Sequence, residues 1–432
     1  MKQMNDNNKT RENRIILLLS LAAVIAACVP LFTKLCINGH DLEYHLLRIE
    51  SLKEQILAGR PFLKVNMLFF GGAGYASSMF YPDLLLYIPA ALRALGVSIN
   101  TSYHVFAGLC ILLCYLSAFY CGREITGSKA AGALCAILLT LCDYHIEDIY
   151  VRSAVGEYTA FIFIPFVICG IHDTLYREMK KPWLLGVGFG GLLLSHTGSF
   201  IMCLGLCIVI FLIKLKVFVK KPRIIAKLLL TALLTAGATS FYWLPMLEQL
   251  MCAGFAVSIP WMRPVDETRS FAQLFYSEFP SIGAGLITVY VLRVFVDKEE
   301  NPLSGFSDIL YVTGGVFMLG ATGLFPWERL GRYMGFIQFP WRSFIIASSL
   351  FAFADGILIF CLFREKGMPK EKTTEEAAGS DKGTDVKAAG SERLTSAEAR
   401  KDRVIYATAG VFLLCALQAF SVMENNDQGY YD

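Results

Sequence analysis

Residues 15–32 read IILLLSLAAVIAACVPLF, an unbroken apolar run that follows a basic start with Lys2, Lys9, Arg11 and Arg14. A helix of about 20 apolar residues is long enough to cross the roughly 30 Å hydrocarbon core of a bilayer. The run is longer than the apolar core of a typical signal peptide, and further apolar runs follow it. We therefore interpret it as an uncleaved first transmembrane helix, which sets the fold class as a protein built in the membrane.

The composition of the 432-residue chain agrees with this interpretation. It is 55% hydrophobic and 17% charged, with a mean hydropathy of +0.52. A soluble chain of this length cannot bury so much apolar surface. The formal net charge of +3 gives no indication of nucleic-acid binding. Most of the 13 cysteines lie in apolar runs and the sequence has no CxxC pair, so neither zinc nor a redox dithiol is indicated.

The apolar runs predict an all-α integral membrane protein of about 11 transmembrane helices. We place these helices near residues 15–33, 102–122, 129–145, 157–176, 183–196, 198–213, 224–249, 279–296, 307–325, 342–363 and 404–422. Most of the 39 lysines and arginines then fall in segments on the side of the N-terminus. The positive-inside rule therefore predicts a cytoplasmic N-terminus and an extracytoplasmic C-terminus.

The chain divides into four predicted parts. Residues 1–14 form a cytoplasmic N-terminus, and residues 15–363 form the transmembrane domain. Residues 364–403 are rich in Lys, Glu, Ala, Gly, Thr and Ser and lack aromatic residues, which predicts a disordered cytoplasmic linker. Residues 404–432 form the last transmembrane helix and an outer tail.

The outer segment 34–101 is the largest predicted connection within the transmembrane domain. In DLEYHLLRIESLKEQILAG (41–59), apolar residues recur at helical spacing and a glycine ends the pattern, which predicts an amphipathic helix. The run 84–95 is too short to span a bilayer and carries Arg93, so we expect a second, interfacial or re-entrant helix there.

Polar side chains gather where the predicted helices meet the outer leaflet. Charged groups at membrane depth cost about 2.5–3.5 kcal/mol each, so such a group indicates a functional site. These residues are Asp41, Glu43, His45, Arg48, Asp143, His145, Glu147, Asp148, Arg152, Glu157, His196, Glu248, Arg263, Gln338, Trp341 and Arg342. Carboxylates can supply a general base, and arginines suit a phosphate. Together they favour a reaction on a lipid phosphate or pyrophosphate at the outer leaflet.

Each of these residues also has an ordinary structural explanation. Asp41 could simply cap the amphipathic helix, because Asp is a preferred N-cap residue. His45 and Arg48 could form a solvated or headgroup-contacting face, and Arg152 could pair internally with Glu157. Comparable explanations are a polar loop for 143–148, a structural histidine for His196 and headgroup snorkelling for Arg342.

Three stretches resemble a bacterial family of membrane proteins labelled 6-pyruvoyl-tetrahydropterin-synthase-related, which is akin to the YfhO-type transferases. They are GHDLEYHLLRIESLKEQILAGRPFLKV (39–65), VRSAVGEYTAFIFIPF (151–166) and FIQFPWRSF (336–344). The resemblance extends from about residue 35 to residue 363. Asp41-Leu42-Glu43 also resembles the acidic D-x-E motif in the first outer loop of GT-C type glycosyltransferases, whose donors are polyprenyl-phosphate sugars. Nothing in the sequence resembles a soluble pterin enzyme.

The GT-C resemblance implies a role for each polar group. Asp41 would be the base that deprotonates an acceptor hydroxyl, supported by Glu43. The second acidic motif would be Asp143, His145, Glu147 and Asp148, whose sequence DYHIED differs from D-x-D and so leaves a divalent cation (Mg or Mn, on Asp41 and Asp143) open. Arg342, followed by Arg152 and Arg263, would hold the donor phosphate. The supporting residues would be His45, Arg48, Glu157, His196, Glu248, Gln338 and Trp341, and Tyr81, Trp261 and Trp341 would stack on a sugar or anchor at the interface.

The sequence therefore predicts a glycosyltransferase of the bacterial plasma membrane, and the GT-C resemblance implies that it inverts the anomeric carbon by direct displacement. Its substrates would be a polyprenyl-phosphate sugar and a hydroxyl acceptor of the cell envelope, and its surroundings membrane lipids. Two alternatives stay open: a transporter or flippase of a lipid-linked glycan, and a non-catalytic scaffold in which the D-x-E motif is only a cap. The Asp41→Asn substitution separates an enzyme from a scaffold.

Overall fold

The computed structural model describes residues 2–62, 64–255, 263–274, 280–293, 302–334, 337–364, 406–424 and 429–431. In this part of the chain the regular structure is helical, apart from three isolated β-bridges. The helices are α1 (Lys2–Cys28), α2 (Leu42–Leu57), α3 (Ser77–Phe80), α4 (Tyr87–Ala94), α5 (Ile99–Thr126), α6 (Lys129–Thr140), α7 (Asp143–Tyr150), α8 (Val155–Ala160), α9 (Ile164–Tyr176), α10 (Trp183–Leu193), α11 (Thr197–Ile213), α12 (Leu215–Lys220), α13 (Pro222–Ala238), α14 (Ser240–Cys252), α15 (Ala284–Leu292), α16 (Pro302–Gly320), α17 (Trp327–Met334), α18 (Phe344–Arg364) and an unlabelled last helix, Tyr406–Glu424.

The predicted number of about 11 membrane spans is not confirmed. Among the described residues, six helices are long and apolar enough to cross a membrane, and two bent helix pairs raise the number to eight at most. The six are Thr10–Phe32, Ile99–Thr126, Val155–Tyr176, Pro302–Gly320, Pro340–Leu362 and Tyr406–Glu424. The bent pairs are α6 with α7, at 48°, and α13 with α14, at 78°. The runs predicted at 183–196 and 198–213 form the shorter helices α10 and α11, and the predicted linker 364–403 lies outside the described residues beyond Arg364.

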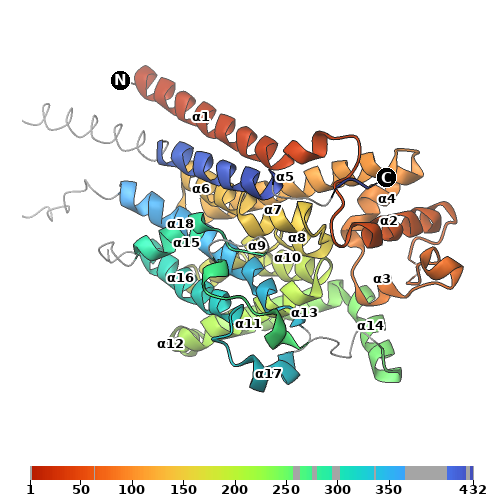
Figure 1. Cartoon of the computed structure of the whole chain (residues 1–432). Coiled ribbons are helices and arrows are strands. Elements are labelled where there is room, and N and C mark those ends of the chain that lie inside the picture. Colours follow the sequence, from red (N-terminus) through yellow and green to blue (C-terminus); the bar gives the residue numbers. More distant parts are fainter. Residues whose placement is uncertain are drawn as a thin grey trace, which may run out of the picture.

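The core of the bundle is built around α18. This helix packs against α6 and α16, and α6 packs against α5 (Figure 1). Small residues allow these close approaches, because a side chain at Gly356 or Gly132 would collide with α6 or α5. By contrast, only 17% of the apolar window of Thr10–Phe32, the part of α1 and the turn after it that could span a membrane, is buried, as expected for a helix that faces lipid on the edge of the bundle.

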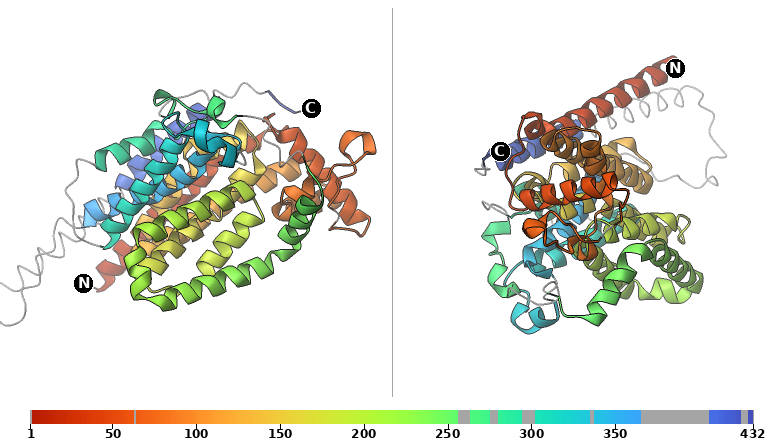
Figure 2. Two further views of the ribbon diagram at one scale, coloured as in Figure 1. Left: turned by 90° about the horizontal axis from the view of Figure 1, so that it is seen from below. Right: turned by 90° about the vertical axis from the view of Figure 1, so that its right-hand side faces the viewer.

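The connection between α1 and α5 covers one end of the bundle (Figure 2, right). The predicted amphipathic helix is confirmed as α2, which buries Leu42, Leu46, Ile49 and Leu52 and packs against α4. The predicted helix at 84–95 is present as a 3₁₀ turn followed by α4. The loop thus brings the start of α2 to the α7–α8 connection, because His40 and Asp41 bond to Val151 and Arg152, and it brings Tyr81 next to His196, which precedes α11.

Candidate functional site

Backbone hydrogen bonds hold Asp41 in place, while its side chain makes no capping bond. It occupies the N-cap position of α2, but its carboxyl makes no capping hydrogen bond. The N–H groups of His40 and Asp41 instead donate to the carbonyl oxygens of Val151 and Arg152, at 3.2 and 2.8 Å. The Asp41 side chain is accessible to solvent, yet the surrounding protein raises its pKa by desolvation, while the positive charges of Arg152 and Arg342 act to lower it.

Arg152, whose backbone binds Asp41, is the centre of a buried ion-pair network. Arg152 donates from Nη1 to Asp148 Oδ1 at 2.6 Å and from Nη2 to Glu157 Oε1 at 2.8 Å. Tyr144 donates its hydroxyl to Glu157 Oε2 at 2.7 Å, and the Arg152 guanidinium lies 4.6 Å from the centre of the Trp341 ring. The internal pair between Arg152 and Glu157 is confirmed. Arg152 is buried and engaged by two carboxylates, and its predicted contact with a donor phosphate stays a prediction.

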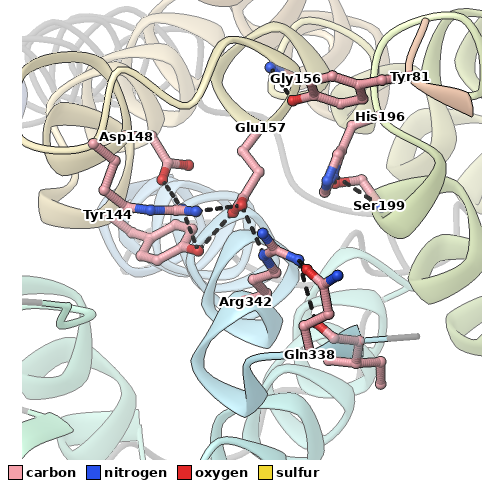
Figure 3. Close-up of polar contacts among 11 residues, drawn as sticks. Tyr81, Tyr144, Asp148, Gly156, Glu157, His196, Ser199, Gln338 and Arg342 are labelled. Atoms are coloured by element: carbon pink, nitrogen blue, oxygen red, sulfur yellow. Dashed lines mark hydrogen bonds and ion pairs between the residues drawn. The ribbon is translucent and has the colours of Figure 1, made fainter. Parts of the chain in front are cut away.

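Arg342 joins this network from another part of the chain and is partly exposed. Its Nε donates to Glu157 Oε1 at 3.1 Å and its Nη1 to Gln338 Oε1 at 2.7 Å (Figure 3). Its side chain is 19% exposed, whereas that of Glu157 is 2% exposed. Gln338 and Ser153, which flank the site on two segments, both have positive φ, at 61° and 54°. Such strained residues persist where the surrounding structure determines them, and they cluster at functional sites.

His196 and Tyr81 lie on the other side of Glu157 (Figure 3). His196 Nδ1 accepts the N–H of Ser199 at 3.2 Å, so the proton of the neutral ring is on Nε2. Burial lowers the pKa of His196 to about 4, and the ring is therefore neutral near pH 7. The Tyr81 hydroxyl accepts the N–H of Gly156 at 3.0 Å, and a Cβ at Gly156 would lie 2.2 Å from that hydroxyl. The glycine thus allows Tyr81 to reach the residue beside Glu157.

His45 and Arg48 do not form the solvated face that their spacing on α2 allowed. Both are buried, because Arg48 forms an ion pair with Asp83 and donates to the Pro82 carbonyl oxygen at 2.8 Å. The Arg48 guanidinium also lies 4.4 Å from the centre of the Tyr81 ring, and burial with the nearby Arg48 charge lowers the pKa of His45 well below its usual range. Together they fix the segment that carries Tyr81 against α2.

The acidic residues of the predicted second acidic motif contact two different sets of partners. The motif forms the helix α7 rather than a loop, and only Asp148 reaches the arginine network. Asp143 and Glu147 instead contact Ser281. The Ser281 hydroxyl lies 3.4 Å from Asp143 Oδ2, and the backbone N–H of Ser281 donates to Glu147 Oε2 at 3.1 Å. The His145 ring contacts the carbonyl oxygen of Thr140 at 2.8 Å inside the bundle. Their functional roles stay predictions.

Three other predicted residues lie outside the network. Arg263 is 75% exposed and its nearest ion-pair contact is Asp266, at 3.9 Å. Glu248 is exposed on α14, and Glu43 is exposed in the first turn of α2. Trp261 lies outside the described residues. Among the described residues, no three His, Cys, Asp or Glu side chains are grouped closely enough to hold a metal ion, and the predicted cation stays a prediction.

Several residues of the site were not predicted. Tyr144, Asp83 and Ser199 hold Glu157, Arg48 and His196 respectively. Tyr144 lies inside the quoted DYHIED segment and could have been noted for that reason. For Asp83 and Ser199 the sequence carries no comparable signal.

An apolar groove begins beside His196. A cavity of about 650 Å³ lies between α10, α11, α13 and α14, and its lining includes Thr197, Phe200, Ala232, Thr235 and Trp243. Figure 2 (left) shows α13 and α14 forming the wall opposite α10 and α11. A smaller cavity of about 210 Å³ extends it toward α12 and shares lining residues with it.

The end of this groove is linked to the polar site. The hydroxyl groups of Thr197 and Tyr242 lie 3.3 Å apart, and Tyr242 donates to the carbonyl oxygen of Phe80 at 3.0 Å. Phe80 precedes Tyr81, and Thr197 follows His196. One end of the apolar groove, its rim, therefore adjoins the polar residues around His196 and Tyr81.

Comparison with known proteins gives the following. The family model described as "6-pyruvoyl-tetrahydropterin synthase related domain; membrane protein" matches residues 78–355. Comparison with curated protein sequences gave no match. Among solved structures, the chain aligns with the archaeal oligosaccharyltransferase AglB from Archaeoglobus fulgidus, in complex with an inhibitory peptide and a dolichol-phosphate, at a TM-score of 0.47 and 10% identity. That alignment covers 95% of this chain and 56% of the other, so the chain spans about half the length of that protein. Since the family model matches more than half of its residues, this chain belongs to the 6-pyruvoyl-tetrahydropterin synthase related family of membrane proteins.

Proposed function

We propose that this membrane protein is a glycosyltransferase that moves a sugar from a polyprenyl-phosphate donor to an acceptor hydroxyl, with Asp41 as the general base. The observation that carries the proposal is the position of Asp41, an uncapped and accessible carboxyl on which the charges of Arg152 and Arg342 act, both arginines being bound to Glu157. A base next to a fixed positive group is what a direct displacement with a phosphate leaving group requires.

In the proposed reaction, Asp41 accepts the proton of the acceptor hydroxyl as its oxygen attacks the anomeric carbon. A bond forms between that oxygen and that carbon, and the bond from the carbon to the donor phosphate oxygen breaks. The electron pair leaves with the polyprenyl phosphate, so negative charge develops on the phosphate. Desolvation by the surrounding protein, which raises the pKa of Asp41, makes its carboxylate a stronger base than an aspartate of ordinary pKa.

Arg342 is the proposed phosphate-binding residue. It is the partly exposed arginine of the network, and its contacts to Glu157 and Gln338 use Nε and Nη1. Within the part of the chain that the structure describes, this leaves Nη2 for a ligand. A planar guanidinium fixed by a carboxylate can hold a phosphate oxygen without reorganising during the reaction. His196, with its proton on Nε2, is a neutral hydrogen-bond donor near Glu157.

The apolar groove supports a lipid-linked donor. It shares a rim with His196 and continues along α11, a helix of 17 residues that is roughly 25 Å long at 1.5 Å per residue. A donor whose phosphate lies at Arg342 could place its hydrocarbon chain there, within the apolar part of the bundle. The lining is mostly aliphatic and aromatic, which suits an isoprenoid chain.

The test is transfer of radiolabelled sugar from a panel of polyprenyl-phosphate sugars, by purified protein in nanodiscs with a membrane extract as acceptor. We expect the Asp41→Asn variant to lose at least about 10²-fold in turnover, because general-base catalysis contributes about 10²–10⁴-fold. The control is Glu54→Gln, an exposed acid near the far end of α2.

Two results would contradict the proposal. If the wild type consumes no donor, or if Asp41→Asn is fully active, Asp41 is not the base of a glycosyltransferase. Movement of a labelled glycan across the membrane without release of polyprenyl phosphate would then favour the transporter, and absence of both activities would favour the scaffold.

A further inference from the structure

The C-terminal residues pair with the segment that leads into Asp41. The N–H of Asn38 donates to the carbonyl oxygen of Gly429 at 3.0 Å, and the N–H of Tyr431 donates to the carbonyl oxygen of Cys36 at 2.9 Å. These bonds frame an antiparallel bridge between Ile37 and Tyr430. Figure 1 shows the C-terminal end beside the segment that precedes α2.

The opposite side of the same segment is bound to the α7–α8 connection. The N–H groups of His40 and Asp41 donate to the carbonyl oxygens of Val151 and Arg152. Gly39 lies so close to this connection that an added Cβ would be 2.2 Å from Ser153 Oγ. Residues 36–41 are therefore held between the C-terminal residues on one side and the connection that carries Arg152 on the other.

The last helix completes this arrangement. Gln418, on the helix Tyr406–Glu424, donates from Nε2 to Asp143 Oδ2 at 2.9 Å, and Ala419 on the same helix is 1% exposed. Asp143 begins α7, and α7 ends just before the two carbonyl groups that bind His40 and Asp41. The last helix thus binds α7, which leads into the carbonyl groups that hold His40 and Asp41, while residues 429–431 bind the segment that leads into Asp41.

We propose that residues 429–431 form a positioning strand, which holds residues 36–41 so that Asp41 keeps its place beside Arg152. The inference rests on the proposed function only for the claim that this placement affects turnover. An irregular segment without backbone hydrogen bonds opens locally and exchanges its amide hydrogens fast, whereas a segment bonded on both sides is protected from exchange. A base displaced by about 1 Å can lose up to about 10²-fold in rate, so loss of one side should reduce turnover measurably.

The decisive variant is Tyr431→Pro in the full chain in nanodiscs. Proline has no N–H, so the variant loses the bond to the Cys36 carbonyl oxygen. The matched control is Tyr431→Ala, which also loses the aromatic ring but keeps the N–H. A second variant, Gly429→Val, disturbs the other end of the bridge, because Gly429 has φ of 70° and no atom within 4 Å of an added Cβ.

The first measurement is amide hydrogen exchange over residues 36–42, which does not depend on any activity. We expect exchange to be about tenfold faster in Tyr431→Pro and Gly429→Val than in Tyr431→Ala. The second measurement is sugar transfer, where we expect turnover in Tyr431→Pro to fall about tenfold relative to Tyr431→Ala, with the KM for the donor within about twofold.

Unchanged exchange in both backbone variants would overturn the positioning strand. Faster exchange with unchanged turnover would overturn its effect on Asp41. If the wild type transfers no sugar from any donor, the proposed function fails, whereas the exchange result still decides whether residues 429–431 hold the segment.

Discussion

The backbone N–H of Asp41 donates to the carbonyl oxygen of Arg152 at 2.8 Å. The residue that places the candidate base is thus the same residue that holds Glu157, and through Glu157 the partly exposed Arg342. The geometry of base and proposed phosphate clamp is therefore fixed through shared partners rather than through direct contact.

The pKa of Asp41 predicts the acid limb of the pH–rate profile. Desolvation raises this pKa, so the carboxyl is protonated and inactive as a base at pH values where an ordinary aspartate is ionised. We expect kcat/KM to rise with pH through a transition above the usual range of aspartate. The positive charge of Arg342 lowers the pKa of Asp41, so Arg342→Gln should move the transition to higher pH. If the transition does not move, the charge of Arg342 does not influence the pKa of the base.

Arg152 is predicted to act mainly on stability. Removing its charge in Arg152→Met takes the arginine partner away from the buried carboxylate of Asp148 and leaves that of Glu157 with Arg342 and Tyr144. We expect the free energy of unfolding to fall by about 3–5 kcal/mol, measured by denaturation in micelles. The combined variant Arg152→Met, Asp148→Asn and Glu157→Gln removes these charges as well and should recover part of the loss. If Arg152→Met is as stable as the wild type, the network does not support the fold.

Arg342 is predicted to act mainly on donor binding. Lysine keeps the charge but cannot contact Glu157 and Gln338 while presenting a planar group to phosphate. We expect Arg342→Lys to raise the KM for the donor about tenfold, with a thermal midpoint close to that of the wild type. Arg263→Lys is the comparison, because Arg263 was also predicted to bind phosphate but lies exposed near Asp266. An equal effect of the two substitutions would contradict the preference for Arg342.

The apolar groove predicts a dependence on the length of the donor chain. Ala232 lines the groove on α13, and tryptophan there would fill part of its volume. We expect Ala232→Trp to raise the KM for long-chain donors at least about fivefold, and to change the KM for a donor with one or two isoprene units little. The control is Leu233→Trp, at the neighbouring position, where the side chain is 70% exposed outside the groove lining. Equal effects on long and short donors would show that the chain lies elsewhere.

The helical elements of the fold were predictable where a long apolar run or a clear period defined them. The spans starting near residues 15, 102 and 342 and the amphipathic helix α2 correspond to helices in the structure. The number of spans was not predictable, because apolar content does not reveal whether a short run crosses the membrane or bends. The Lys129–Tyr150 and Pro222–Cys252 runs are each broken into two helices at an angle.

The candidate site was only partly predictable for a similar reason. The sequence indicated that Asp41, Arg152, Glu157, Arg342 and Gln338 belong to one end of the bundle, but spacing cannot reveal partners on other helices. The six-residue stretch DYHIED forms one helix whose acids face different neighbours, Ser281 for Asp143 and Glu147 and Arg152 for Asp148. Likewise, Arg48 is buried because Asp83 lies opposite it, a partner 35 residues away in the chain.

The sequence by itself determined that this is a membrane protein, because its apolar runs match the thickness of a bilayer, and it identified the polar residues that do not belong in lipid. The tertiary structure decided which of those residues form one network and which do not. The reason is physical: hydrophobic length is a property of consecutive residues, whereas a buried charge is stabilised by whichever partner the packing of distant helices brings within hydrogen-bond distance.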